Sequence, residues 1–288
     1  MKKFSRRELI VSTAAASTVS TVIGESRDLQ AQDVPQAPSQ APSPAKKRDW
    51  WDKEFRTLVT LGESTTAGGW ASHRERAWAH QLARTINEYQ RVPVQLLNVG
   101  IGANVISTRS PAYEHSGKPA ALERLEPHVL RHKPDLLVVS YGLNDARGGT
   151  PIGLFAEEMR TLIDRVRVEI QPLILLLGPY YMTGFDRFGP HWNNATLELF
   201  HHFNTATSKV AAEKDCLFVD LLSAYGNANW LVHHDTVHAN DLGHRVVANR
   251  VFEVLASNCS GLAKETQELE NRIPRWRDES VLQRDAAK

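Results

Sequence analysis

Five short apolar runs, separated by longer stretches of mixed polarity, constrain the fold of this chain more than any other feature of its sequence. We expect the runs to form strands at residues 56–61, 94–99, 135–140, 173–177 and 217–220. The stretches between and after them predict helices at residues 74–91, 154–170, 194–214 and 241–257. Strands that alternate with helices in this way predict an α/β fold, with one parallel sheet and helices on both of its faces.

A serine follows directly on the first apolar run, in the segment Gly62-Glu63-Ser64. A buried strand that ends here presents the hydroxyl at the C-terminal edge of the sheet, where loops can be shaped without disturbing the core. Ser64 is therefore the candidate nucleophile. A serine at this position can also serve only to cap the next helix, so the assignment depends on a base and an oxyanion site elsewhere in the chain.

Three further polar segments follow later strands and should reach the same edge of the sheet as Ser64. They are residues 98–104, 140–145 and 233–241. A serine hydroxyl needs a neighbouring imidazole as general base, and a carboxylate holds that imidazole in one tautomer. His238 and Asp235, three residues apart in one segment, can provide this pair.

Acyl transfer also needs donors that are aimed at the developing oxyanion before the reaction starts. The backbone around Gly102 offers N–H groups, the backbone N–H of Ser64 offers another, and the side chain of Asn144 offers an amide. Asn144 alone would also suit a turn after a strand.

Together the four segments resemble the four sequence blocks of the SGNH (GDSL-type) hydrolase superfamily, in the right order and over residues 55–254. The resemblance implies a three-layer α/β/α sandwich with a five-stranded parallel sheet, similar to flavodoxin. It implies a carboxylic ester hydrolase that needs no cofactor and no metal. By the same resemblance Ser64, Asp235 and His238 form a catalytic triad, and Asn144 donates to the oxyanion.

Two positions depart from the pattern of that superfamily. Its Gly-Asp-Ser is Gly62-Glu63-Ser64 here, so an additional methylene must fit beside the nucleophile. Its glycine block places the oxyanion glycine at Ala103, one position after Gly102. Because the donor is a backbone N–H, alanine can serve if its φ need not be positive. Both Gly102 and Ala103 therefore stay candidates.

Aromatic side chains near the predicted sheet edge are the main indication of the substrate. They can stack on sugar rings, line an acyl pocket or simply pack in the core; they are Trp70, Tyr180, Tyr181, Phe185, Phe188, Trp192 and Trp230. The predicted export and the lack of a long apolar lid segment favour short-chain acyl esters of carbohydrate-like substrates. The alternative is a lipid acyl hydrolase, similar to a lysophospholipase, that uses the same triad.

Two interpretations from other classes remain open. His234 and His238 are spaced as in HExxH, in which two histidines of one helix bind zinc, so a metal-dependent hydrolase is an alternative. The β-branched Thr236 and Val237 disfavour a helix at that place. The second alternative is a binding module that keeps the fold without the chemistry, for which Glu63 and Ala103 are the only support.

The N-terminus predicts export. Four basic residues within residues 1–8 precede an apolar run at residues 9–23, which is typical of a signal peptide, and Arg6-Arg7 resembles the twin-arginine type. We therefore divide the chain into an export signal at 1–32, a proline-rich linker at 33–49, a catalytic domain at 50–260 and a charged tail at 261–288. The mature protein should be periplasmic or extracellular.

Composition limits the partners of the chain. A formal net charge of +1 gives no electrostatic case for nucleic acid. No segment has the 18 or so apolar residues of a membrane-spanning helix, so we expect no stable membrane insertion of the mature form. The expected partner is a small-molecule or glycan ester. Cys216 and Cys259 are far apart in sequence, and two buried thiols are expected in preference to a disulfide.

Overall fold

The computed structural model describes residues 47–187, 189–270, 272 and 279–286. The predicted export signal and, apart from residues 47–49, the predicted linker lie outside these residues, as does Phe188. The export signal, the localisation and the division into domains therefore stay predictions. Among the described helices, none combines the length and the apolar character needed to cross a bilayer.

Five strands form one all-parallel sheet in the order β2-β1-β3-β4-β5. The strands are β1 Thr57–Gly62, β2 Gln95–Asn98, β3 Leu136–Ser140, β4 Leu173–Leu177 and β5 Leu217–Val219. Each strand lies where an apolar run predicted it. The predicted α/β fold with a five-stranded parallel sheet is confirmed.

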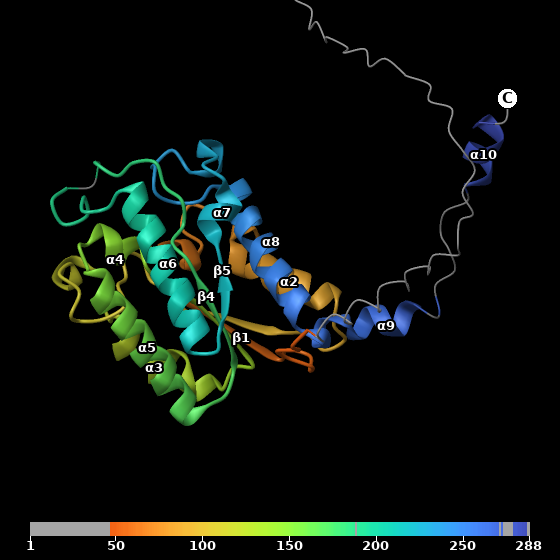
Figure 1. Cartoon of the computed structure of the whole chain (residues 1–288), viewed down its shortest axis with the longest axis horizontal. Coiled ribbons are helices and arrows are strands. Elements are labelled where there is room, and N and C mark those ends of the chain that lie inside the picture. Colours follow the sequence, from red (N-terminus) through yellow and green to blue (C-terminus); the bar gives the residue numbers. More distant parts are fainter. Residues whose placement is uncertain (1–46, 188, 271, 273–278, 287–288) are drawn as a thin grey trace, which may run out of the picture. The chain divides into compact units, whose positions relative to one another are not determined.

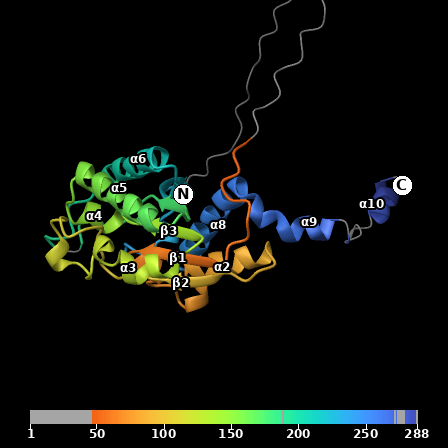
Figure 2. The same cartoon turned by 90° about the horizontal axis from the view of Figure 1, so that it is seen from below.

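Helices cover both faces of the sheet, as the alternating pattern predicts. The long helices are α2 Trp78–Glu88, α5 Ile152–Glu169, α6 Leu197–Glu213 and α8 Asp241–Asn258. Helices α5 and α6 lie on one side of the sheet, and α2 and α8 lie on the other (Figure 1). Figure 2 shows α5 and α6 above strands β1 and β2. The shorter helices are α1 Ser64–Ala67, α3 Leu125–His128, α4 Leu143–Arg147, α7 Leu221–Tyr225, α9 Lys264–Glu270 and α10 Ser280–Ala286.

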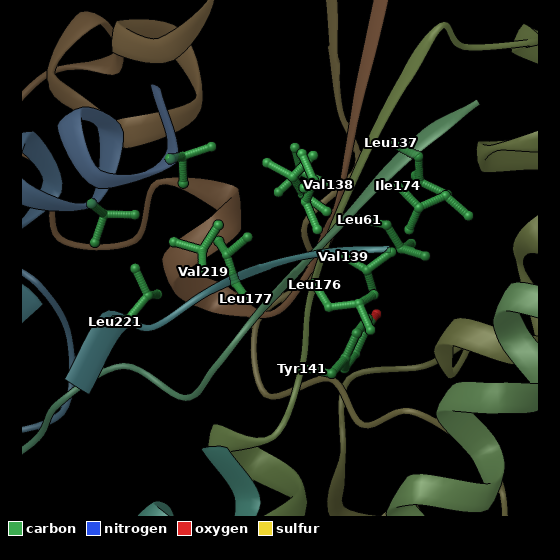
Figure 3. Packing of buried hydrophobic residues seen from close by; sticks show 14 of the residues in the cluster. Leu61, Leu137, Val138, Val139, Tyr141, Ile174, Leu176, Leu177, Val219 and Leu221 are labelled. Carbon is green, nitrogen blue, oxygen red and sulfur yellow. The ribbon is translucent and has the colours of Figure 1, made fainter. Parts of the chain in front are cut away.

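The core runs through the three central strands. Every residue of β3 and β4 is buried, and so is every residue of β1 after Thr57. A parallel strand with helices on both faces needs apolar side chains on both of its faces, which explains the nearly continuous Leu and Val runs. Figure 3 shows side chains such as Leu61, Val139 and Leu176 packed together in this layer. This packing gives a rigid base to the loops at the strand ends.

One predicted helix is wrong at its start. Instead of a helix from residue 74, a 3₁₀ turn covers Arg74–Arg76, Ala77 is extended, and α2 begins at Trp78. The break lets the Trp78 side chain reach the core, where it is fully buried. The Trp78 N–H donates to Nδ1 of His244 at 3.3 Å, so α8 fixes the point at which α2 begins.

The chain order of the strands places a topological switch point beside β1. From β1 the chain crosses to β2 on one side, and the next strand, β3, lies on the other side of β1. In open α/β sheets, ligands bind outside the carboxyl ends of strands at such a point. Ser64 follows β1 and Asn144 follows β3, so the fold places both beside this crevice.

The start of the predicted tail packs on the start of the described chain. The N–H of Gly261 donates to the carbonyl of Trp51 at 3.1 Å, and Leu262 is buried. Cys216 and Cys259 are both buried and both free, so the expectation of two thiols is confirmed.

Candidate active site

The turn between β1 and α1 positions the Ser64 hydroxyl. Glu63 has extended backbone and Ser64 is the first residue of α1. Gly62 makes the turn tight: a Cβ there would lie 2.3 Å from Oγ1 of Thr66 and 2.6 Å from the carbonyl oxygen of Ser140. Ser64 keeps only 9% of its surface exposed, and its Oγ lies 2.7 Å from Nε2 of His238. The hydroxyl therefore binds an imidazole and does not merely cap the helix.

Asp235 holds the other side of the His238 ring. Nδ1 of His238 hydrogen-bonds Oδ2 of Asp235, while Oδ1 of Asp235 accepts the N–H groups of Val237 and His238, each at 3.1 Å. Three bonds thus fix the carboxylate, and the carboxylate fixes the ring. The three predicted triad residues form one continuous chain of hydrogen bonds.

The triad loop, residues 232–239, is closed on itself. Val232 and Ala239 form an antiparallel bridge, and the His233 N–H donates to the carbonyl of His238 at 2.7 Å. Thr236 has φ +72°, which a β-branched residue rarely adopts and which costs about 1–3 kcal/mol. The N–H groups of Thr183 and Gly184, at 2.9 and 3.1 Å from the Thr236 carbonyl oxygen, hold it in place.

The alternative zinc motif does not form. His234 and His238 would need to share one helical face, but they lie in a bridged turn that ends before α8. Both ring nitrogens of His238 are already bonded, to Ser64 and to Asp235. Within the described residues, no group of three or more His, Cys, Asp or Glu side chains is arranged to hold a metal ion.

Trp70 covers the triad histidine. Its indole stacks on the His238 ring, with the ring centroids 4.1 Å apart and the planes only 4° from parallel. Trp70 reaches this position with φ +65°, and 49% of its surface stays exposed. The stacking stops the imidazole from turning away from Ser64. Trp230, the other tryptophan expected beside this loop, is 73% exposed and does not line the cavity.

A cavity of about 370 Å³ opens over the Ser64 hydroxyl. It brings together all the predicted site residues except Asp235, which lies behind the histidine. Its lining consists of Ser64, Trp70, Gly102, Ala103, Asn144, Arg147, Trp192 and His238. We call it the active-site cavity.

The residues that carry the four expected oxyanion donors, three backbone N–H groups and one side-chain amide, line this cavity. Within the described part of the chain, no protein acceptor takes the backbone N–H of Ser64, Gly102 or Ala103. Ala103 has φ +53°, a left-handed conformation that costs alanine roughly 1 kcal/mol more than glycine. A Cβ at Gly102 would meet nothing within 4 Å, so space does not require glycine at position 102. The backbone conformation that favours glycine is at position 103 instead, which holds alanine. The condition set for alanine is therefore not met, but Ala103 adopts the positive φ all the same and lines the cavity, so its N–H and that of Gly102 both stay candidates for the oxyanion.

Glu63 is accommodated by hydrogen bonds from two backbone N–H groups. Its carboxylate accepts the N–H of Gly142 at 3.0 Å and the N–H of Asn144 at 3.2 Å, so it joins the end of β1 to the start of α4. Burial raises the pKa of the Glu63 carboxyl well above its ordinary value, and the neighbouring Asp145 raises it further. Glu63, where the sequence departs from the superfamily pattern, therefore helps to orient helix α4, which carries Asn144.

Residues 60–246 match the family described as GDSL-like Lipase/Acylhydrolase, and this match spans well over half of the chain. The chain belongs to this family. It is therefore a GDSL-type acylhydrolase, a carboxylic ester hydrolase, and the resemblance seen in its sequence is confirmed.

Solved structures show the same fold at low sequence identity. A lipase/acylhydrolase from Enterococcus faecalis is 21% identical with a TM-score of 0.56, over 70% of this chain and 96% of that one. An acetyl xylan esterase, AlAXEase, is 22% identical with a TM-score of 0.53, over 69% and 99%. An acetylxylan esterase from Geobacillus stearothermophilus is 19% identical with a TM-score of 0.52, over 70% and 95%. No curated protein sequence matches this chain.

Not all of the aromatic side chains expected near the substrate reach the cavity of this acylhydrolase. Trp70 and Trp192 line it, but Tyr180 and Tyr181 are buried and Phe185 packs on Phe200. The hydroxyl of Tyr180 accepts a hydrogen bond from Ser140, and Tyr181 donates to Asn229. These three rings belong to the loop after β4 and anchor it to the hydrophobic core.

Arg147 is the cavity residue that sequence reasoning missed. It ends α4, is 7% exposed, and donates from a guanidinium nitrogen to Oδ1 of Asn144 at 3.1 Å. Its distance of three residues from Asn144 is the signal that would have found it, because residues three apart share one face of a helix.

Burial and pairing set the proton affinities of the triad. Burial lowers the pKa of His238 below its ordinary value of 6.5, although the bond to Asp235 opposes that shift. Burial alone would raise the pKa of Asp235, but hydrogen bonds from His238 and Val237 outweigh it, so this pKa is lowered. At neutral pH the arrangement therefore holds a neutral imidazole against a charged carboxylate.

We expect kcat/KM of this acylhydrolase to fall as the solution is acidified, with a midpoint below pH 6.5. A general base must be unprotonated, and the lowered pKa of His238 moves its protonation to more acidic solution. The measurement is kcat/KM for a neutral ester from about pH 4 to about pH 9, with circular dichroism at each pH as the control for folding. A flat profile, or a midpoint above pH 6.5, would contradict the assignment of His238 as the base.

Proposed function

We propose that this chain is a serine esterase that removes short acyl groups from carbohydrate-like substrates through an acyl-enzyme. The observation that carries the proposal is the hydrogen-bonded chain from Asp235 through His238 to Ser64, whose hydroxyl opens into the active-site cavity. This arrangement fits acyl transfer by a serine nucleophile.

The chemistry follows from these contacts. His238 takes the proton of the Ser64 hydroxyl as Oγ attacks the carbonyl carbon of the ester. The N–H groups of Ser64 and of Gly102 or Ala103, with the Asn144 amide, bind the resulting oxyanion. The protonated His238, stabilised by Asp235, then donates its proton to the leaving alcohol oxygen. A water molecule, deprotonated by His238, attacks the carbonyl carbon of the acyl-enzyme. The bond between that carbon and Oγ then breaks, His238 returns the proton to Oγ of Ser64, and the acid leaves.

The lining of the cavity favours a short acyl group. The side chains of Asn144 and Arg147 are polar, and a long alkyl chain lying against them would bury polar groups without giving them hydrogen bonds. The indoles of Trp70 and Trp192 provide flat apolar faces that can cover a sugar ring. The structural likeness to two acetyl xylan esterases agrees with this substrate class.

A panel of esters tests the substrate class. We expect hydrolysis of p-nitrophenyl esters to be fastest with acetyl and to decline steadily through butyryl and octanoyl to dodecanoyl, and we expect acetate release from acetylated xylooligosaccharides. The reason is that a long alkyl chain in this cavity would have to lie against the polar side chains of Asn144 and Arg147, whereas an acetyl group need not. The measurement is kcat/KM for each ester, together with enzymatic assay of free acetate.

Other results would replace the proposal. Fastest turnover of the octanoyl or dodecanoyl ester would favour the lipid acyl hydrolase. No turnover of any ester, with no labelling of Ser64 by a serine-reactive phosphonate, would favour the non-catalytic binding module. The two departures that would support that module do not disrupt the site. Glu63 accepts hydrogen bonds from two backbone N–H groups, and Ala103 lines the cavity.

A further inference from the structure

The orientation of the Asn144 amide is fixed by two neighbours. Its Oδ1 accepts a hydrogen bond from the Arg147 guanidinium at 3.1 Å, and its Nδ2 donates to the carbonyl oxygen of Asn104 at 3.2 Å. The Asn144 side chain is buried, with 2% of the residue exposed. The amide nitrogen carries two hydrogens, so one goes to Asn104 and the second is left for the active-site cavity that Asn144 lines.

A flip of this amide would bring like groups together at both ends. Nδ2 would then point its hydrogens at the guanidinium, which is only a donor, and Oδ1 would face the carbonyl oxygen of Asn104, which is only an acceptor. Two buried donors and two buried acceptors would lose their partners, and each such loss costs about 1–3 kcal/mol. The flipped amide would also present an oxygen to the oxyanion.

Asn104 cannot easily move to relieve such a flip. Its side chain is fully buried and accepts hydrogen bonds from Arg124 and from the Tyr141 hydroxyl, and it donates to the carbonyl of Pro119 at 2.8 Å. One end of the Asn144 amide therefore rests on a rigid backbone. The other end depends on Arg147 alone among the contacts described for Oδ1.

We propose that Arg147 is a positioning residue of the esterase: its guanidinium holds Oδ1 of Asn144 so that Nδ2 faces the oxyanion. The inference rests on the proposed function, because it assigns Arg147 a role in the same reaction. Arg147 also lines the cavity, but it acts on the oxyanion through Asn144, and so its main contribution with a small acetyl ester is to the transition state. Removing it should lower kcat and leave KM unchanged.

The test is a double-mutant cycle on p-nitrophenyl acetate with Arg147→Met and Asn144→Ala. Methionine keeps much of the apolar length of arginine and cannot donate. We expect R147M to lower kcat by roughly 10- to 100-fold with KM unchanged, somewhat less than the roughly 10²- to 10³-fold expected for N144A. In the N144A background, R147M should have no further effect, because the group through which it acts is gone. R147K, which restores a donor, should recover part of kcat.

Controls separate this role from a structural one. R160M removes an arginine of α5 that pairs with Glu213 on the surface, and it should keep wild-type kcat. Thermal unfolding of each variant shows whether it is folded; if R147M is not, R147K replaces it in the cycle, with a smaller loss of kcat expected in the wild-type background and none in N144A. A raised KM with unchanged kcat, wild-type kcat in R147M, or a full additional loss in N144A would overturn the proposal. Failure of the proposed function would look different, since S64A would then hydrolyse the ester as fast as the wild type.

Discussion

Substitution of Ser64 by alanine is expected to lower kcat/KM for ester hydrolysis by about 10⁴- to 10⁶-fold, close to the background rate. The hydroxyl is the only group of residue 64 that His238 can deprotonate, and its Oγ lies 2.7 Å from Nε2 of that ring. The variant should remain folded, because one hydroxyl on a tightly held turn contributes only about 1 kcal/mol to stability. The measurement is initial rate on p-nitrophenyl acetate, with thermal unfolding alongside.

Ser223→Ala is the matched control for S64A. Ser223 belongs to α7, is exposed, and does not line the active-site cavity. It should keep wild-type turnover and phosphonate labelling, whereas S64A should lose both. Turnover by S64A at more than about one hundredth of the wild-type rate would exclude Ser64 as the nucleophile.

Substitution of Asp235 by asparagine should have the second largest effect, a loss of about 10⁴-fold in kcat at neutral pH. Asparagine can still accept the N–H groups of Val237 and His238 through its oxygen, so the loop should keep its shape. Its amide nitrogen would then face Nδ1 of His238 as a donor and favour the wrong tautomer. It would also provide no charge to stabilise the imidazolium. Steady-state kinetics at pH 7.5, about one unit above the ordinary histidine pKa, measures the effect.

His233→Gln is the control for D235N. Nδ1 of His233 accepts the N–H of Asp235 at 3.2 Å, but His233 does not contact Ser64. The H233Q variant should lose less than about tenfold in kcat, because residue 233 contacts the backbone of Asp235 and not the reacting atoms. Comparable losses in H233Q and D235N would mean that the shape of the loop matters and the carboxylate does not.

The strands and most of the site could be predicted because each rests on a short-range pattern. A buried parallel strand needs a continuous apolar run, and polar residues at the end of such a run reach the sheet edge whatever the rest of the chain does. This pattern placed Ser64, Asn144 and the pair Asp235 and His238 at one edge of the sheet, where the structure has them. The helix start at Trp78 could not be found, since it depends on His244, a residue more than 160 positions later.

The cavity lining was harder to predict, because the same residue types serve the core. Tyr180 and Tyr181 follow β4 as Trp192 does, yet the tyrosines turn inward and only Trp192 lines the cavity. Arg147 was overlooked because α4 is only five residues long, so the three-residue spacing from Asn144 was the only sign that the two share a helical face. Trp70 was expected near the nucleophile, but its stacking on His238 depends on a positive φ that no sequence pattern around it announces.

The two hydrogen bonds from Thr183 and Gly184 to the carbonyl of Thr236 limit how this enzyme can be adapted to other esters. Gly184 admits no larger residue, since a Cβ there would lie 1.8 Å from Oγ1 of Thr236. Library design on the loop after β4 should therefore leave these first positions intact and randomise only the part beyond Phe185. Changes nearer the strand would displace the triad loop, and with it His238. Variants selected for a new leaving group would then lose turnover because the general base has moved, not because the ester is bound less well.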